Sequence, residues 1–213
     1  MTSRTSRWLP LSGVLFVVLF VLSGAAAGAQ PDTSAPGATV IAYAKDHQNG
    51  IRFSAILVGL SLFVGLLFYG QVRHVLRQDP DSESWAAIAF GGAVLFAAGG
   101  GVVSGVGLAL SEEPGKLDPG AAQALNLLYM DIPLVLFVGV GILMFFFGVA
   151  IVRSRLLPTW VGWLGLVCGV VALLPVEFIG FAGASVWTLA VSIILILRPA
   201  STPAASPQRV EVS

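Results

Sequence analysis

The sequence predicts an all-α fold: a polytopic transmembrane helical bundle with five spans after a signal-like N-terminus, or six if that N-terminus is uncleaved. Hydrophobic residues make up 56% of the 213 residues and charged residues only 10%, whereas soluble domains carry about a quarter charged residues. Several apolar stretches approach the ~20 residues that a helix needs to cross ~30 Å of hydrocarbon. Because backbone amides in lipid have no water partner, such stretches form helices rather than open strands.

Charge and cysteine content exclude several classes of function. Lys and Arg together number 11, and so do Asp and Glu; without a positive surplus, we expect no nucleic-acid partner. Cys168 is the single cysteine, which excludes an internal disulfide, a CxxC redox pair and a cysteine-based zinc site. We expect it to pack as a small apolar residue, and we expect no cofactor.

Residues 1–29 have the features of either a signal peptide or a first transmembrane helix. Two arginines precede an apolar stretch over residues 9–22, and the small-residue sequence "SGAAAGAQ" follows. Small-x-small patterns within residues 25–29 favour cleavage near Gln30. The alternative is an uncleaved helix, because residues 9–29 are also long enough to span a membrane.

The rest of the chain divides into three parts. Residues 30–50 form a polar extracytoplasmic segment, residues 51–198 a helical membrane domain, and residues 199–213 a disordered cytoplasmic tail in which Pro, Ala and Ser predominate. Within the membrane domain the expected spans are residues 51–72, 86–110, 132–152, 158–174 and 181–197.

Basic residues predict how the spans are threaded, because cytoplasmic loops are enriched in Lys and Arg. With residue 50 outside, the inner set is Arg73, Arg77, Arg153, Arg155, Arg198 and Arg209, and the outer set is Lys45, Arg52 and Lys116. Keeping the first segment adds Arg4 and Arg7 to the inner set and leaves the orientation unchanged. The C-terminus is therefore predicted to be cytoplasmic.

The sequence "NLLYMDIPLVLF", residues 126–137, places Asp131 two positions before Pro133 in an apolar run. Counting from Arg153 at ~1.5 Å per residue puts Asp131 about 33 Å away, at the outer edge of the hydrocarbon. We interpret Asp131 as the N-cap of the next helix, with residues 121–130 as a separate short helix at the outer surface. The alternative is one Pro-kinked helix that buries the carboxylate.

Glu177, in "LLPVEFIG", lies at the turn between the last two spans and also faces outward. Two carboxyls that share a poorly solvated pocket do not both ionise freely, so such a pair can hold a proton or a cation. Asp131 and Glu177 are therefore a candidate proton or cation site. They support an alternative function as a small transporter or channel.

Glycines at fixed spacing predict close helix packing. Gly101 and Gly105 have GxxxG spacing in the second span, and Gly165 and Gly169 are four apart in the fourth. Small residues let helix backbones approach closely in lipid, so we expect these faces to pack within the monomer or between copies. A phosphate-binding loop would need a preceding strand and a following Lys or Ser/Thr.

The sequence contains no recognisable catalytic or metal-binding constellation. His47 and His74 lie outside the spans and on opposite sides, so neither serves Ser104 as a base and together they do not ligate a haem. The paired glutamates of "SEEPGK" lie in an outer loop with no histidine after them. We therefore expect no enzymatic activity and no metal.

The sequence "LLPTWVGWLGLVCGVVALL" after "RSR", within residues 126–197, resembles uncharacterised bacterial multi-pass membrane proteins of domain-of-unknown-function families. In these proteins a long span, a short basic turn, an "LPxWLGWLG"-like entry and a final span recur. The resemblance implies a bacterial cytoplasmic membrane and carries no catalytic residues. We expect a structural, accessory or sensory component that acts through helix packing, with the bilayer and further copies or another membrane protein as partners.

Overall fold

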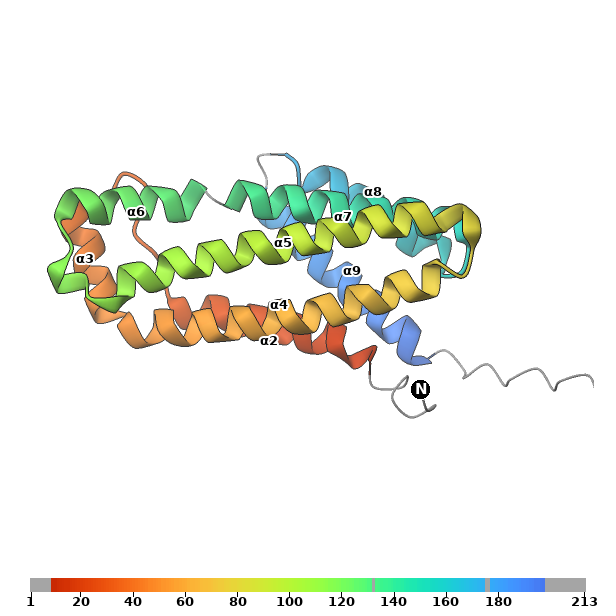
Figure 1. The fold of residues 1–213 in the computed structure, drawn as a ribbon, viewed down its shortest axis with the longest axis horizontal. Coiled ribbons are helices and arrows are strands. Elements are labelled where there is room, and N and C mark those ends of the chain that lie inside the picture. The colour runs from red at the N-terminus through yellow and green to blue at the C-terminus, as the bar shows by residue number, and fades with distance from the viewer. Residues whose placement is uncertain (1–8, 132, 175–176, 198–213) are drawn as a thin grey trace, which may run out of the picture.

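The protein is a bundle of helices whose long axes run mostly in one direction (Figure 1). The computed structural model describes residues 9–131, 133–174 and 177–197, and these residues form helices and turns without strands. In chain order the elements are α2 (Leu11–Ala27), α3 (Gly37–Asp46), α4 (Gln48–Leu76), α5 (Pro80–Glu112), the 3-10 turn η1 (Pro114–Lys116), α6 (Pro119–Asp131), α7 (Pro133–Ser154), α8 (Thr159–Val171) and α9 (Glu177–Leu197). The predicted all-α bundle is confirmed.

Aspartates begin two of these helices. The carboxylate of Asp79 accepts a hydrogen bond from the backbone N–H of Asp81 (3.3 Å) at the start of α5, and Pro80 occupies the first turn. The carboxylate of Asp118 accepts one from Gly120 (2.9 Å) at the start of α6. The first N–H groups of a helix have no partner within it, and proline has no N–H to satisfy, so these residues favour the observed starting points.

Four stretches of the described chain are long and apolar enough to cross a membrane: Gln48–Leu76, Pro80–Glu112, Pro119–Ser154, which runs across residue 132, and Ile179–Leu197. The expected spans over residues 51–72 and 86–110 lie inside α4 and α5, which are longer at both ends. The predicted cytoplasmic tail, residues 199–213, lies outside the described residues.

Helix α8 is shorter than the span predicted over residues 158–174. It contains 13 residues, which is about 20 Å at ~1.5 Å per residue and less than a ~30 Å hydrocarbon core requires. Residues 172–174 leave the helix as a turn. Helix α8 alone is therefore too short to cross the hydrocarbon core, and the predicted span also needs the non-helical residues 172–174.

Glycines bring the backbones of α5 and α7 into direct contact, and this is the most extensive helix pair in the fold. A Cβ at Gly92 would lie 2.5 Å from the backbone nitrogen of Leu143, and one at Gly139 would lie 2.5 Å from that of Phe96. Backbone atoms cannot move aside as a flexible side chain can. The close approach of α5 and α7 therefore depends on glycine at both positions.

Aromatic rings join helices from both ends of the sequence into one core. The Phe16 ring of α2 meets Tyr69 of α4 and Phe96 of α5 edge-on, with centroids 5.9 and 6.2 Å apart. Trp187 of α9 is fully buried, and its Nε1 donates a hydrogen bond to the carbonyl of Val161 in α8 (2.9 Å). Edge-on pairs and satisfied indole groups are favourable arrangements in a dry interior.

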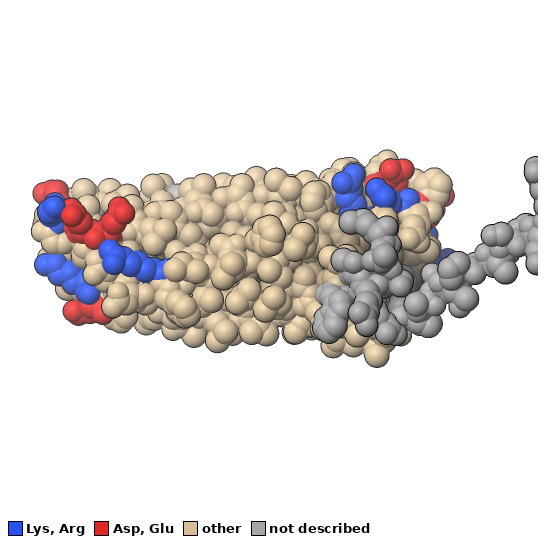
Figure 2. Space-filling model, turned by 60° about the horizontal axis from the view of Figure 1, so that its bottom comes forward, with Lys and Arg blue, Asp and Glu red and all other residues tan. Residues whose placement is uncertain are grey.

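Lys, Arg, Asp and Glu side chains gather at the two ends of the bundle on the face that Figure 2 shows. The region between the ends, which we call the uncharged belt, has none of these four residue types among the side chains that the structure describes; those of Asp131 and Glu177 are outside the description. At one end, which we call the α3 end, Arg52 donates a hydrogen bond to the carbonyl of Glu112 (3.4 Å) and Lys116 pairs with Glu113 (2.8 Å). Because a charged side chain is costly in hydrocarbon, the belt is the part of the surface that suits a bilayer.

The opposite end, which we call the arginine end, carries the arginines of the predicted inner set that lie in the described chain. The guanidinium of Arg73 lies over the ring of Phe90 (5.6 Å to the centroid), and that of Arg153 lies over Trp85 (5.1 Å). Such contacts let an arginine remain beside apolar surface while keeping its charge near water. The two basic sets read from the sequence thus lie at opposite ends of the bundle.

The segment predicted to be merely polar, residues 30–50, contains helix α3, which lies across the end of the bundle (Figure 1). Gly37 of α3 abuts the backbone carbonyl of Pro119, and Val40 is buried with Leu110 and Ala122 in a small second core. α6 extends along the bundle in line with α7 rather than lying flat on the surface (Figure 1). Packing against α3 holds it there.

Candidate functional site

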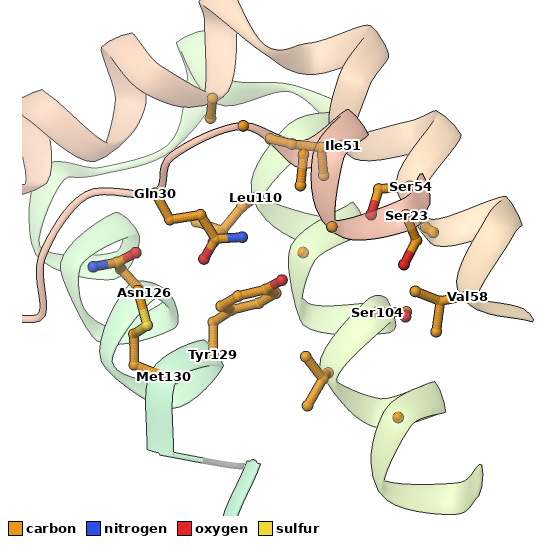
Figure 3. A pocket seen from close by; sticks show the side chains of 18 of the residues that line it. Ser23, Gln30, Ile51, Ser54, Val58, Ser104, Leu110, Asn126, Tyr129 and Met130 are labelled. Carbon is orange, nitrogen blue, oxygen red and sulfur yellow. The ribbon is translucent and has the colours of Figure 1, made fainter. Parts of the chain in front are cut away.

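A cavity of about 490 Å³ lies inside the bundle near the α3 end (Figure 3). Its walls come from α2, α3, α4, α5, α6, the α2–α3 loop and the first turn of α7. Helix α6 packs mainly against α3 and makes few contacts with α5, which leaves space between them. The volume falls within the range of about 300–1,000 Å³ that is typical of small-molecule sites.

The cavity occupies the half of the uncharged belt nearest the α3 end. Phe90 of α5, which Arg73 covers, marks the arginine end of the belt. The lining residues of α5 run from Gly100 to Leu110, about 15 to 30 Å farther along the helix at ~1.5 Å per residue. For a hydrocarbon core of ~30 Å, the cavity therefore extends from about the middle of the bilayer to its surface at the α3 end.

The cavity lining combines aliphatic walls with uncharged polar side chains. The aliphatic residues include Val40, Ile51, Val58, Leu110, Met130 and Leu136. The polar residues are Ser23, Gln30, Tyr43, Ser54, Ser104, Asn126 and Tyr129. None of the described lining residues carries a charge at neutral pH.

Three of these polar groups donate hydrogen bonds within the protein. The hydroxyl of Tyr43 donates a hydrogen bond to the carbonyl of Ala27 (2.6 Å), which ties α3 to the end of α2. The amide of Asn126 donates to the carbonyl of Asp32 (3.1 Å), which ties α6 to the α2–α3 loop. Ser23 donates to a carbonyl in the preceding turn of its own helix (2.6 Å). The first two bonds therefore tie together elements that form the cavity wall.

The side chains of Gln30, Ser54, Ser104 and Tyr129 form no hydrogen bond with any other group in the described chain. Ser54 and Ser104 lie toward one end of the cavity, and Gln30 and Tyr129 lie toward the other (Figure 3). Polar groups in a low-dielectric site gain substantially from a partner. They are therefore available to bind a ligand along the length of the cavity.

Aromatic rings close the cavity on the side of the arginine end. Phe20, which lines the cavity, stacks on Phe181 of α9 with ring centroids 4.8 Å apart. Phe181 in turn contacts the rings of Phe96 and Phe137, at 5.9 and 6.2 Å. This floor is apolar and offers no hydrogen-bonding group, so it suits the hydrocarbon part of a ligand.

Tyr43 and Tyr129 place two phenol side chains in the cavity wall. Burial raises the pKa of Tyr43 above its ordinary value of 10.0, and the proximity of Tyr129 raises it further. The Tyr43 phenol is therefore protonated at physiological pH and able to donate its hydrogen bond to Ala27. Tyr43 therefore adds no charge to the cavity wall at that pH.

The two acids that the sequence suggested as a shared site, Asp131 and Glu177, lie at the ends of two helices. α6 ends at Asp131, directly after the lining residues Tyr129 and Met130, and α9 begins at Glu177. The side chains of Asp131 and Glu177 lie outside the described residues, and so does the interpretation of Asp131 as an N-cap. A shared proton or cation site formed by the two acids stays a prediction.

The four glycines singled out for helix packing fall into two groups. A Cβ at Gly165 or Gly169 of α8 would lie 3.0 or 2.5 Å from backbone atoms of α7, so these positions lie within a tight contact. Gly101 and Gly105 of α5 face outward, and no atom lies within 4 Å of the place where their Cβ atoms would be. The GxxxG face of α5 is thus uncovered in the single chain.

The two histidines lie at opposite ends of α4. His47 precedes the helix and His74 is in its last turn, about 40 Å away at ~1.5 Å per residue. The ring of His47 stacks on Tyr43 with centroids 4.5 Å apart. Ser104 does line the cavity, but neither histidine is among the lining residues.

Sequence reasoning missed the cavity and the roles of Ser54, Asn126 and Tyr129. Each is a polar residue within a largely apolar helix, which is a recognisable signal of a functional or packing role in a membrane protein. The sequence does not show that these helices enclose a common space, because that depends on how far α6 stands from α5.

The fold and the cavity define an integral membrane protein: a helical bundle with apolar helices long enough to cross a membrane and a cavity whose described lining residues are uncharged. The chain belongs to the family described as "Domain of unknown function (DUF4386)", whose model matches residues 11–202 and therefore includes α2. This confirms the predicted membership of a domain-of-unknown-function family. No curated protein and no solved structure matches the chain.

Proposed function

We propose that the protein is a sensory or accessory membrane component that binds a neutral amphipathic lipid in the cavity at its α3 end. The observation that supports this proposal is the cavity itself, which places uncharged hydrogen-bonding side chains inside aliphatic walls at bilayer depth. Largely apolar pockets with a few convergent polar groups are the usual form of small-molecule sites.

The lining favours a ligand that is neither charged nor purely hydrocarbon. A charged group would lose its hydration without meeting an opposite charge among the described lining residues. A pure hydrocarbon would displace water from Ser54, Ser104 and Gln30 and leave their polar groups without partners. A hydrocarbon chain with hydroxyl or amide groups, such as a monoacylglycerol, satisfies both requirements.

The hydrogen bonds around the cavity support a sensory or accessory role. Asn126 and Tyr43 line the cavity and also fasten α6 and α3 to the end of α2 and its following loop. A ligand that contacts these residues therefore contacts the elements that form the surface of the α3 end. If the α3 end can adopt two arrangements, a ligand that binds one of them more tightly shifts the population toward that arrangement.

The binding proposal is tested with 1-monooleoylglycerol and the purified full chain in mild detergent, using native mass spectrometry to count retained lipid. Ser104→Leu adds bulk inside the cavity, and we expect it to reduce retained 1-monooleoylglycerol at least tenfold. Gly105→Leu is the matched control, because it adds a larger side chain at the next position, where nothing lies within 4 Å. The control should retain as much lipid as the native chain.

A second arm replaces 1-monooleoylglycerol with oleate, which has the same chain and a charged head. We expect weaker retention of oleate, because the described lining offers no cation. Equal retention of 1-monooleoylglycerol by the native chain and Ser104→Leu would contradict binding in the cavity. Stronger retention of oleate would contradict the neutral ligand class.

A further inference from the structure

Helix α2, which coincides with the signal-like segment of the sequence, is built into the core of the bundle. Gly13 abuts the hydroxyl of Ser192 in α9 and the ring of Phe68 in α4. Phe16 is only 5% exposed and contributes to the aromatic core. α2 packs extensively against α4 and also against α9. A cleaved leader would make none of these contacts in the mature protein.

The small-residue stretch before the predicted cleavage point contacts other helices of the fold. The backbone is helical through Ala27, whose carbonyl accepts a hydrogen bond from Tyr43 (2.6 Å). Gly50 of α4 abuts the carbonyl of Ala26, where a side chain would have no room. Binding of a peptide in an extended conformation, through its main-chain hydrogen-bonding groups, is one of the common modes of peptide recognition. Residues 25–27 are helical and contact two neighbouring helices, so they do not offer that conformation; residues 28–30, at the predicted cleavage point itself, lie in the irregular segment that follows the helix.

The same segment supplies one wall of the cavity. Five lining residues come from α2 and the position that follows it: Phe20, Ser23, Gly24, Ala27 and Gly28. Phe20 also forms the floor by stacking on Phe181. Without this segment the cavity would lose one wall, and the rings of Phe96 and Tyr69 would lose their contacts with Phe16.

We infer that the signal-like segment is a permanent first helix of the mature protein, which enters from the arginine end and completes the cavity. Its short, largely apolar run, small-residue end and two preceding arginines reproduce a secretory signal in sequence. Its contacts with α3, α4 and α9 hold the helix, up to Ala26 and Ala27 in the small-residue stretch, within the folded bundle. The family match, which begins at residue 11, includes this helix.

The inference is tested on the full chain, carrying a C-terminal tag, after production in a bacterium with an active signal peptidase. The measurements are intact mass and N-terminal sequencing of the protein purified from the membrane. We expect an N-terminus at or before residue 10. An N-terminus at any later position, above all between residues 25 and 31, would overturn the inference.

Ala29→Leu is the matched control, because Ala29 is exposed and its replacement blocks cleavage after a small residue. The native chain and Ala29→Leu should differ in mass only by the substitution. A native chain lighter by the whole segment, beside an intact Ala29→Leu chain, would show that processing does occur. This outcome is separate from lipid retention: an intact chain that binds no 1-monooleoylglycerol would contradict only the proposed function.

Discussion

At the scale of single residues, Tyr43 connects the cavity to the rest of the fold. Its hydroxyl is the donor that fastens α3 to Ala27 at the end of α2. Burial raises the pKa of Tyr43, so the stabilising neutral form is fully present below its ordinary value of 10.0 and is lost as the pH rises through the higher folded value. The bond therefore persists at physiological pH.

Replacing Tyr43 with Phe removes this hydrogen bond and keeps the ring. We expect the free energy of unfolding to fall by about 1 kcal/mol, because the Ala27 carbonyl loses its donor in a half-buried position. The measurement is denaturant-induced unfolding in mixed micelles at neutral pH.

Tyr129→Phe provides the comparison for Tyr43→Phe. The Tyr129 hydroxyl bonds to no other described group, so its loss should leave stability nearly unchanged. Equal destabilisation by the two variants would mean that the Tyr43 bond has no particular structural role.

At the scale of helices, neighbouring glycines of α5 have different roles. Gly92 faces α7, where a Cβ would lie 2.5 Å from the Leu143 nitrogen and 2.9 Å from the Gly139 oxygen. Gly91 faces outward, and nothing lies within 4 Å of the place where its Cβ would be. Only one of the two therefore permits the close approach of the helices.

Gly92→Ala should destabilise the bundle by about 1–3 kcal/mol, because the added methyl meets backbone atoms and the helices must separate. Gly91→Ala should leave stability unchanged or raise it by about 0.5 kcal/mol, because alanine has the higher helix propensity. Unfolding of both variants in the same micelles tests this pair. Similar losses from the two substitutions would show that the α5–α7 contact is less close than described.

At the scale of the whole molecule, the separation of charges defines two ends. The α3 end carries Arg52 and Lys116, and the arginine end carries Arg73 and Arg153. Between them the described side chains on the face in Figure 2 are uncharged. The excess of arginine at one end supports the sequence-based prediction that this end is cytoplasmic. The cavity would then lie in the outer leaflet.

This orientation predicts which engineered cysteines an impermeant maleimide reaches in intact cells. In a Cys168→Ala background, Lys116→Cys should react without permeabilisation, and Arg77→Cys should react only after it. Both positions are exposed, so accessibility depends on the side of the membrane. The reverse labelling pattern would contradict the orientation and would place the cavity in the inner leaflet.

Much of the helical pattern could be predicted from apolar length alone. The spans expected over residues 51–72 and 86–110 lie within α4 and α5, because hydrocarbon leaves helix as the available conformation for a long apolar segment. The starts of α5 and α6 also follow local chemistry, through Asp79 and Asp118. The small apolar core around Val40 was missed, because residues 30–50 are not apolar enough to suggest a packed helix.

The candidate site was much less predictable. Ser54, Ser104 and Asn126 could be noted as polar residues in apolar helices, but their convergence depends on the gap between α5 and α6. The glycine spacing was equally ambiguous: Gly165 lies in a tight contact, whereas Gly101 faces outward. Spacing places residues on one helix face, and it does not say which neighbour that face meets.

The sequence by itself determined that this protein is a helical membrane bundle with its basic residues divided between two ends. Unpaired backbone amides and charged side chains are both costly in hydrocarbon, and this cost can be judged for each segment without knowing its neighbours. The tertiary structure alone decided that α2 is part of the core, that α3 and α6 form a second small core, and that a chamber lies beneath them. These features depend on the distances between helices. Those distances are set by contacts between residues far apart in the chain, such as Gly13 with Ser192 and Asn126 with Asp32.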